Sequence, residues 1–212
     1  CACCACAAED RPRMDLALSD VDGTITTRET FADFVRTAAP PERVARGRWQ
    51  LAPWIAGYRL GMVSGTTVRA KIVDVAFRGL DAATLRERGE DFARQVLPPL
   101  LRPEAMARIA WHRQRGDRVV VVSGGFDLYL APWCAAHALD LICSSLHSVE
   151  GVLTGRYQGA QCVNEEKARQ VQARYPRAQY REVHAYGDTR EDRALLALAD
   201  HVAYRRMPVT TP

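Results

Sequence analysis

The sequence predicts an α/β fold, in which a Rossmann-like, doubly wound parallel sheet carries an inserted all-helical cap. From residue 103 onward, short apolar runs alternate with helical segments, which is typical of parallel strands joined by helical crossovers. Before this alternation, residues 26–102 place apolar side chains at helical spacing and contain no convincing strand. The 212 residues, 48% hydrophobic and 25% charged, suffice for one domain with an insertion and exclude wholesale disorder.

The first predicted strand precedes the insertion directly. Residues 14–19 (MDLALS) form a short apolar run that ends at acidic residues, as expected of a buried strand that runs into a tight turn. We expect residues 14–25 and 103–212 to form the core and residues 26–102 to form the cap. The apolar positions of the cap predict four helices, one of them containing Trp49, Trp54, Ile55 and Tyr58. Predicted helix breaks and ends lie at Gly61, Ser64, Gly79 and Pro98-Pro99.

The remaining elements alternate between helix and strand along the core. The predicted helices cover residues 104–115, a segment through His137, residues 165–175 and residues 192–199. The predicted strands cover residues 118–122, 140–144, 183–186 and 201–204, and residues 149–157 are expected to form a hairpin.

Composition limits the partners and the location. Lys and Arg number 29 and Asp and Glu number 25, a mild excess that is scattered along the chain, so we expect no nucleic-acid partner. No run of about 18 apolar residues predicts a membrane span, and without a signal peptide the expected location is the cytoplasm. Residues 1–13, which contain Cys1, Cys3, Cys4 and Cys6, are interpreted as a leader or an expression remnant, with a metal-binding tail as the alternative. The sequence predicts no oligomeric state.

Residues that could take part in catalysis or ligand binding follow three of the predicted strands. Asp20 and Asp22 follow the first strand, and of two such carboxylates one can act as a nucleophile and the other as an acid or base. The valine run ends at Ser123-Gly124-Gly125, whose hydroxyl and backbone N–H groups would bind an anion. Asp188 and Asp192 follow a third strand. Strands of a parallel sheet end at one edge, and four carboxylates gathered there would repel one another without a cation, for which Mg²⁺ is the best candidate.

Each of these patterns also has an ordinary structural interpretation. An acidic strand end often caps a helix or forms a solvated turn, and a Ser-Gly-Gly sequence is often only a turn. Lys167 alone would be read as a surface lysine. Their arrival on consecutive crossover units of one sheet favours a functional site.

These motifs together resemble the haloacid dehalogenase superfamily, and most closely its phosphoserine-phosphatase-like branch (subfamily IB). Asp20-Val-Asp-Gly-Thr24 resembles the DxDGT motif, and Ser123-Gly-Gly-Phe126 resembles the SGGF phosphate loop. Gly187-Asp188 with Asp192 is similar to the GDxxxD motif, and Gly151-Val-Leu-Thr-Gly155 followed by Lys167 is similar to the hairpin and lysine of that branch. A helical cap inserted after the first motif also fits this family.

The resemblance implies a phosphoric monoester hydrolase. Asp20 would attack phosphorus and carry an aspartyl-phosphate, and Asp22 would protonate the leaving group and then activate water. Mg²⁺ would be held by Asp20, by Asp188 and by the main-chain carbonyl of Asp22. The implied role of Asp192 is to orient the water shell of the metal, and the phosphoryl oxygens would be bound by Ser123, the Gly124 amide and Lys167.

The cap residues decide the expected substrate. Glu29 matches a position that receives the substrate amino group in phosphoserine phosphatases, although it is equally a first-turn helix acid. The arginine that holds the substrate carboxylate in those enzymes is replaced by Ile72, and Arg69 or Lys71 could substitute for it. We therefore expect hydrolysis of a small metabolite phosphomonoester. The alternatives are a lipid-phosphate or sugar-phosphate phosphatase, or a protein that binds a phosphorylated ligand without turnover.

Overall fold

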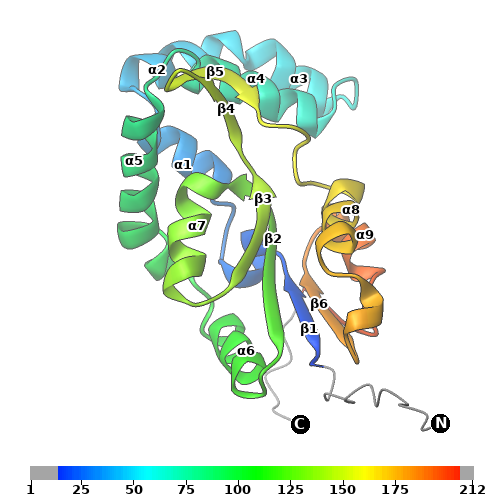
Figure 1. Ribbon diagram of the computed structural model, residues 1–212. Helices are drawn as coiled ribbons and strands as arrows, with labels where there is room; N and C mark the ends of the chain where they lie inside the picture. The colour runs from blue at the N-terminus through cyan, green and yellow to red at the C-terminus, as the bar shows by residue number, and fades with distance from the viewer. Residues whose placement is uncertain (1–13, 206–212) are drawn as a thin grey trace, which may run out of the picture.

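Five parallel strands form the central sheet of the computed structural model, which describes residues 14–205 (Figure 1). In spatial order the strands are β3 (Asp140–Ser144), β2 (Arg118–Phe126), β1 (Leu16–Ser19), β6 (Val183–Gly187) and β7 (His201–Tyr204). Every neighbouring pair is parallel. The central strand β1 is buried along its whole length, which explains its unbroken apolar sequence.

Helices cover both faces of the sheet. They are α6 (Pro103–Gln114), α7 (Asp127–Ala136), α8 (Glu165–Arg174) and α9 (Arg193–Leu196). Val119 and Val121 pack in one hydrophobic cluster with Ile109 of α6 and Leu130 of α7. Leu16, Leu18, Val120 and Val122 point to the other face and pack with residues of α8 and α9. The predicted doubly wound parallel sheet is therefore confirmed.

Five α-helices lie between β1 and α6. They are α1 (Phe31–Ala38), α2 (Pro41–Gln50), α3 (Ala52–Arg59), α4 (Gly65–Phe77) and α5 (Ala82–Gln95), followed by a 3₁₀ turn at Pro98–Leu100. The prediction of four helices was wrong, because the apolar pattern from Trp49 to Tyr58 spans two helices that separate at Leu51. Pro53 stands in the first turn of α3, where its missing N–H and fixed φ favour a helix start. The predicted cap at Ser64 is confirmed, since its side chain accepts a hydrogen bond from the Thr67 amide.

The predicted hairpin is formed by β4 (Leu146–Val149) and β5 (Val152–Tyr157). Although it follows β3 in sequence, its strand β5 packs against α4, at the top of Figure 1. The backbone of Leu153 exchanges hydrogen bonds with this insertion, to Gly79 at 2.7 Å and to Leu80 at 2.8 Å. The hairpin, within the range expected to belong to the core, thus packs with the inserted helices.

Two predicted boundaries differ from the structure. The strand predicted at 118–122 continues to Phe126, so the Ser-Gly-Gly segment is the end of β2. The helix predicted at 192–199 is only α9, because residues 190–192 form a 3₁₀ turn closed by the Asp192 side chain. The expectations for residues 1–13 lie outside the described residues.

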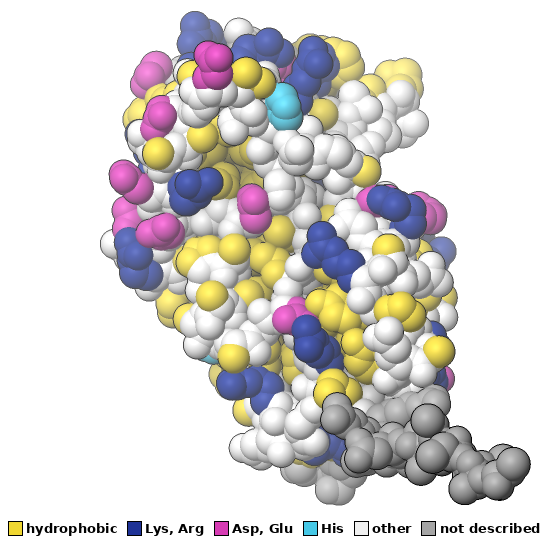
Figure 2. Space-filling view, in the orientation of Figure 1, with side chains coloured by type: hydrophobic (Ala, Val, Ile, Leu, Met, Phe, Trp, Pro, Cys, Tyr) yellow, Lys and Arg dark blue, Asp and Glu magenta, His cyan; other side chains and the backbone are white. Residues whose placement is uncertain are grey.

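The surface adds two observations. Basic and acidic side chains are interspersed over the face shown in Figure 2, without one large patch of either sign. Within residues 14–205, no helix combines the length and the apolar character that crossing a membrane requires.

Candidate active site

Asp20 lies at the carboxyl end of β1, in the centre of the sheet edge, and its side chain is buried. The chain then turns sharply through residues 21–25, where Gly23 has φ +79°. A Cβ atom at Gly23 would lie 2.0 Å from Oδ2 of Asp188. Only glycine therefore permits both this backbone conformation and the close approach of Asp188.

Lys167 of α8 joins the first and third motifs. Its Nζ donates hydrogen bonds of 2.6 Å to Oδ1 of Asp20 and of 2.6 Å to Oδ1 of Asp192. Burial alone would lower the pKa of Lys167, but the two carboxylates outweigh burial and raise it. Burial raises the pKa of Asp20 to about 7, against the opposing effect of Lys167 and with the help of the nearby Asp192 and Asp22 charges. A cation is thus fixed between two buried acids of the site, Asp20 and Asp192.

Asp192 is occupied by hydrogen bonds on both carboxylate oxygens. While Oδ1 accepts from Lys167, Oδ2 accepts from the amides of Asp188 (3.2 Å) and Thr189 (3.0 Å) and from the Thr189 hydroxyl (3.0 Å). Burial opposes its ionisation, but Lys167 and these donors lower its pKa. Asp192 therefore holds the loop that carries Asp188 in place.

Asp22 is oriented by a residue that the sequence did not single out. Oδ1 of Asp22 accepts hydrogen bonds from the Thr30 amide (2.8 Å) and the Thr30 hydroxyl (2.7 Å). The Thr30 hydroxyl also lies 3.0 Å from that of Tyr129. Burial raises the pKa of Asp22 although the Thr30 bonds act in the opposite direction. A threonine just before a helix is a common capping residue, so no sequence signal pointed to this contact.

The Ser-Gly-Gly segment at the end of β2 contributes mainly backbone. Gly124 lines the cavity above Asp20, whereas Ser123 is buried and its Oγ accepts a hydrogen bond from the Gly125 amide at 3.0 Å. That bond leaves the hydroxyl proton of Ser123 to be donated elsewhere. A Cβ atom at Gly124 would lie 2.6 Å from Nη1 of Arg69, so the absence of a side chain here leaves room for the Arg69 guanidinium.

The acidic residues fit a divalent cation. Carboxylate oxygens of Asp20, Asp188 and Asp192 lie within 4.8 Å of one another. Oδ1 of Asp188 is buried and has no hydrogen-bond partner in the described part of the chain. Burial raises the pKa of Asp188, and the neighbouring charge of Asp192 raises it further. An orphaned carboxylate oxygen beside other carboxylates is the hard oxygen donor set that Mg²⁺ prefers.

A cavity of about 470 Å³ opens over these groups. Its lining includes the predicted residues Asp20, Asp22, Glu29, Arg69, Gly124, Lys167 and Asp188. The lining also includes residues that the sequence analysis did not predict as site residues, namely Gly23, Thr27, Arg28, Tyr58, Arg102, Thr189, Arg190 and Glu191. Glu29 is exposed. Lys71 is not brought to the cavity, because its ammonium lies 4.9 Å from the ring centre of Trp54.

Arg69 is the basic residue that α4 contributes to the cavity. Its guanidinium lies 5.2 Å from the ring centre of Phe31, and its Nη2 lies 3.8 Å from a carboxylate oxygen of Glu191. The sequence predicted that the substrate carboxylate clamp is missing, with Arg69 or Lys71 as substitutes. Of these two, the structure places Arg69 at the site.

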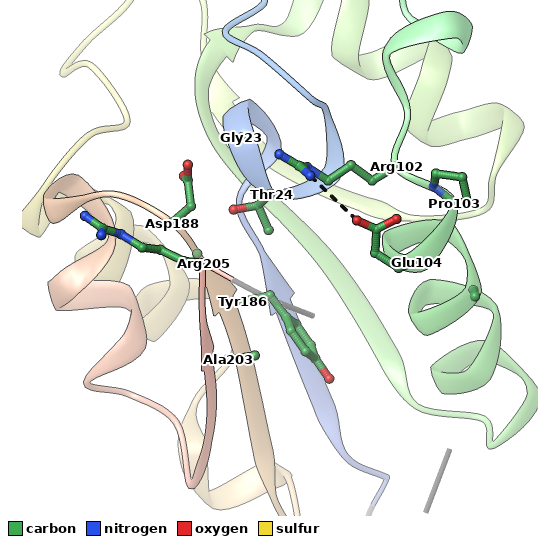
Figure 3. A pocket seen from close by; sticks show the side chains of 11 residues that line it. Gly23, Thr24, Arg102, Pro103, Glu104, Tyr186, Asp188, Ala203 and Arg205 are labelled. Atoms are coloured by element: carbon green, nitrogen blue, oxygen red, sulfur yellow. Dashed lines mark ion pairs between the residues drawn. The ribbon is translucent and has the colours of Figure 1, made fainter. Parts of the chain in front are cut away.

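A larger cavity, of about 730 Å³, lies on the other side of Gly23 and Asp188 (Figure 3). Thr24 and Tyr186 line it, and Arg102 forms an ion pair of 3.6 Å with Glu104 at its edge. Gly23, Arg102 and Asp188 line both cavities.

Comparisons with known proteins agree with this geometry. A family model described as haloacid dehalogenase-like hydrolase matches residues 17–197. The protein CicA of Caulobacter vibrioides is 31% identical over 192 residues, which cover 90% of this chain and 85% of CicA. A protein of unknown function from Bordetella pertussis Tohama I has a similar structure, with TM-score 0.72, 24% identity, and coverage of 89% of this chain and 88% of the other. A probable phosphoserine phosphatase from Vibrio cholerae has TM-score 0.68 and 19% identity, over 90% of this chain and 55% of the other.

Proposed function

This chain belongs to the haloacid dehalogenase-like hydrolases, and on that premise we propose that it is a Mg²⁺-dependent phosphatase of small phosphomonoesters. The observation that carries the proposal is the contact of Lys167 with Asp20. A buried carboxylate held by a fixed cation, in a cavity that also contains Asp22 and the orphaned Asp188, suits attack on a dianionic phosphoryl group.

In the first half of the reaction, a carboxylate oxygen of Asp20 attacks phosphorus. The bond between phosphorus and the ester oxygen breaks, and Asp22 donates its proton to the departing alkoxide. Burial raises the pKa of Asp22, a shift in the direction that a general acid requires. Lys167 and the Gly124 amide are the proposed ligands of the phosphoryl oxygens, together with the hydroxyl of Ser123.

In the second half, Asp22 has become a base. It removes a proton from a water molecule that attacks the phosphorus of the aspartyl-phosphate. The bond between phosphorus and Asp20 then breaks, which releases inorganic phosphate and regenerates both carboxyl groups. Thr30 keeps one oxygen of Asp22 fixed by two hydrogen bonds. The other oxygen is thereby directed to the proton transfers.

Asp20 and Asp188, with the main-chain carbonyl of Asp22, are the proposed ligands of Mg²⁺. When bound, the ion neutralises charge on the carboxylates and on the transferring phosphoryl group. Asp192 keeps Asp188 in place through the amides of residues 188 and 189. This role is a positioning one, because both oxygens of Asp192 are already used by hydrogen bonds.

We propose that residues 26–102 act as the cap that selects the substrate. Glu29 and Arg69 line the same cavity with opposite charges, so an ester that carries both an ammonium and a carboxylate group finds a partner for each. With Ile72 in place of the clamp arginine and neither Arg69 nor Lys71 assigned to the site, the sequence alone favours amine phosphates without a carboxylate. The presence of Arg69 in the cavity supports its role as the substitute, so amino-acid phosphates belong to the proposed substrate class as well.

A lipid phosphate is the second candidate substrate. The side chains of Trp49, Leu60 and Met62 are 84%, 71% and 73% exposed on α2 and just after α3. Tyr58, which is 53% exposed, lines the cavity. Exposed apolar side chains on the helices that contribute to an active-site opening suit an ester with an acyl chain. No observation favours a sugar phosphate in the same way.

The test is a panel of phosphate esters assayed with and without Mg²⁺. Metal-dependent release of phosphate from a chromogenic aryl phosphate is expected, and its absence would favour a binding protein without turnover. Within the panel, higher kcat/KM for amino-acid and amino-alcohol phosphates supports the first substrate class. A preference for short-chain phosphatidic acid or lysophosphatidic acid supports the second.

A further inference from the structure

A second cluster of metal-ligating side chains lies at the amino ends of β6 and β7, at the end of the sheet opposite to Asp20 and Asp188. Glu182, His184 and His201 each offer one ligand atom, and these three atoms lie within 4.8 Å of one another. Glu182 immediately precedes β6, His184 is the second residue of β6, and His201 is the first residue of β7. Because the strands are parallel, this cluster is separated by the length of β6 from Asp188, which follows the other end of that strand.

The backbone explains why these side chains meet. His184 and His201 are direct partners in the register of β6 and β7, so their side chains leave the sheet on the same face. Glu182 precedes His184 by two residues and, by strand alternation, points to that face as well. The two imidazole rings lie 4.7 Å apart, tilted by 21°, and Nε2 of His201 lies 3.1 Å from Oε2 of Glu182.

One ligand atom of the cluster lacks a partner. Nε2 of His184 is buried and forms no hydrogen bond within residues 14–205. Its nearest acidic neighbour is Oδ2 of Asp15, at 3.7 Å. That oxygen already accepts from Arg115 (2.7 Å) and Arg181 (2.8 Å). A buried nitrogen without a hydrogen bond is costly, and a metal ion would satisfy it.

The third histidine of this region is excluded as a ligand. His112 packs against His184, with ring centres 4.9 Å apart. Its two nitrogens are already paired, Nδ1 with Asp117 and Nε2 with the Tyr186 hydroxyl, each at 2.8 Å. His112 therefore forms the wall of the cluster.

We propose that Glu182, His184 and His201 bind a borderline divalent transition-metal ion, with Zn²⁺ as the best fit. Two imidazole nitrogens and one carboxylate oxygen are a donor set that Zn²⁺ accepts and that Mg²⁺ and Ca²⁺ do not favour. The ion clamps edge strand β7 to β6. Ligand atoms each about 2 Å from one ion stand roughly 3–3.5 Å apart, so the rings must turn for their nitrogens to converge. The side chains of His201 and Glu182 are 54% and 46% exposed, so the surrounding packing leaves room for this rotation.

The first test is a Co²⁺ titration of the full chain saturated with Mg²⁺. Co²⁺ in a site with few nitrogen and oxygen ligands absorbs strongly in the visible range, whereas Co²⁺ among carboxylates and waters absorbs weakly. We expect the strong absorption to saturate at one equivalent of Co²⁺ per chain and to disappear when Zn²⁺ displaces the bound Co²⁺. Cysteine thiolates would instead add a near-ultraviolet charge-transfer band.

Variants assign the site. His201→Ala and Glu182→Gln should weaken Co²⁺ and Zn²⁺ binding by at least about tenfold, since even the loss of a supporting contact costs that much. His137→Ala, which removes a histidine packed on Trp133, is the matched control and should bind as the parent does. A visible band that is absent, or that survives His201→Ala unchanged, would overturn the proposal.

A second readout is thermal stability. Zn²⁺ should raise the Tm of the parent and of His137→Ala, because a ligand that binds only the folded state stabilises it, and should not raise that of His201→Ala. Phosphatase activity in saturating Mg²⁺ should be equal in all three proteins. Equal Zn²⁺-induced shifts in all three would place the ion elsewhere and contradict the site.

Discussion

Thr30 holds Asp22 through two hydrogen bonds to the same carboxylate oxygen, one from its amide at 2.8 Å and one from its hydroxyl at 2.7 Å. The side chain that would transfer protons is therefore fixed by a residue of the insertion. Three classes of variant separate the roles of Asp20, Asp22 and Thr30.

Asp20→Asn should lower kcat by at least about a thousandfold, because the amide keeps the shape of the carboxylate but is no nucleophile. The measurement is steady-state hydrolysis of an aryl phosphate, with circular dichroism to show that the fold is retained. A variant that keeps more than a few per cent of the parent rate would remove Asp20 from the nucleophile role.

Asp22→Asn should lower kcat by about a hundred- to ten-thousandfold for alkyl esters, the usual contribution of a general acid or base. The defect should shrink for leaving groups that need no proton. Thr30→Val should lower kcat about tenfold relative to the parent, with the same dependence on the leaving group. Thr30→Ser, which keeps the hydroxyl, should retain most of the parent kcat. Equal defects across the leaving-group series would argue against proton transfer by Asp22.

The two lysines of the chain form a matched pair for the next prediction. Lys167→Ala leaves Asp20 and Asp192 without their cation, so it should destabilise the fold by about 3–5 kcal/mol and weaken inhibition by inorganic phosphate. Urea unfolding and phosphate inhibition measure the two effects. Lys71→Ala should change neither by a comparable amount, and unchanged phosphate inhibition in Lys167→Ala would exclude Lys167 as a phosphate ligand.

Metal removal gives a further prediction. EDTA should stop hydrolysis and Mg²⁺ should restore it, while Ca²⁺, which prefers more ligands and longer bonds, should inhibit. Mg²⁺ should also raise the Tm of the parent more than that of Asp188→Asn, which loses the orphaned carboxylate oxygen. Full activity after exhaustive chelation would contradict the metal proposal.

The cap residues predict a split between two substrate series. Arg69→Met should raise KM for esters that carry a carboxylate by about tenfold, the value of one charge-assisted hydrogen bond, and should leave amino-alcohol phosphates largely unchanged. Glu29→Gln should do the reverse. Lys71→Met, which removes a cation outside the cavity, is the control. If Glu29→Gln changes neither series, Glu29 is only a helix-start acid.

The fold was predictable because its signals are local. The valine run at Val119–Val122, the turn glycine Gly116 and the alternation of strands and helices identify a parallel sheet without any knowledge of long-range contacts. The motifs at Asp20, Gly124 and Asp188 were placed correctly at one sheet edge for the same reason, since parallel strands end together.

The remaining features depend on contacts between distant segments. Thr30 reaches Asp22 only after the chain turns through Gly23, and Arg69 of α4 reaches Gly124 at the end of β2 only in the folded chain. The sequence could not distinguish Arg69 from Lys71, because two residues of a helix at this spacing point in different directions and no local signal says which faces the core. The position of the hairpin on the inserted helices was likewise set by tertiary pairing with Leu80.

The attachment of α5 has a consequence for how the enzyme would open. A Cβ atom at Gly89 of α5 would lie 2.4 Å from the carbonyl oxygen of Leu128 in α7, so these two helices are in backbone contact. We therefore expect α5 to remain with the sheet while α2, α3, α4 and the hairpin swing together. Arg69 would leave with the moving half, whereas Glu29, which precedes α1, would stay behind. A substrate bound by both Arg69 and Glu29 would then lose these two contacts at different times. The rate of product release would depend on which contact breaks first.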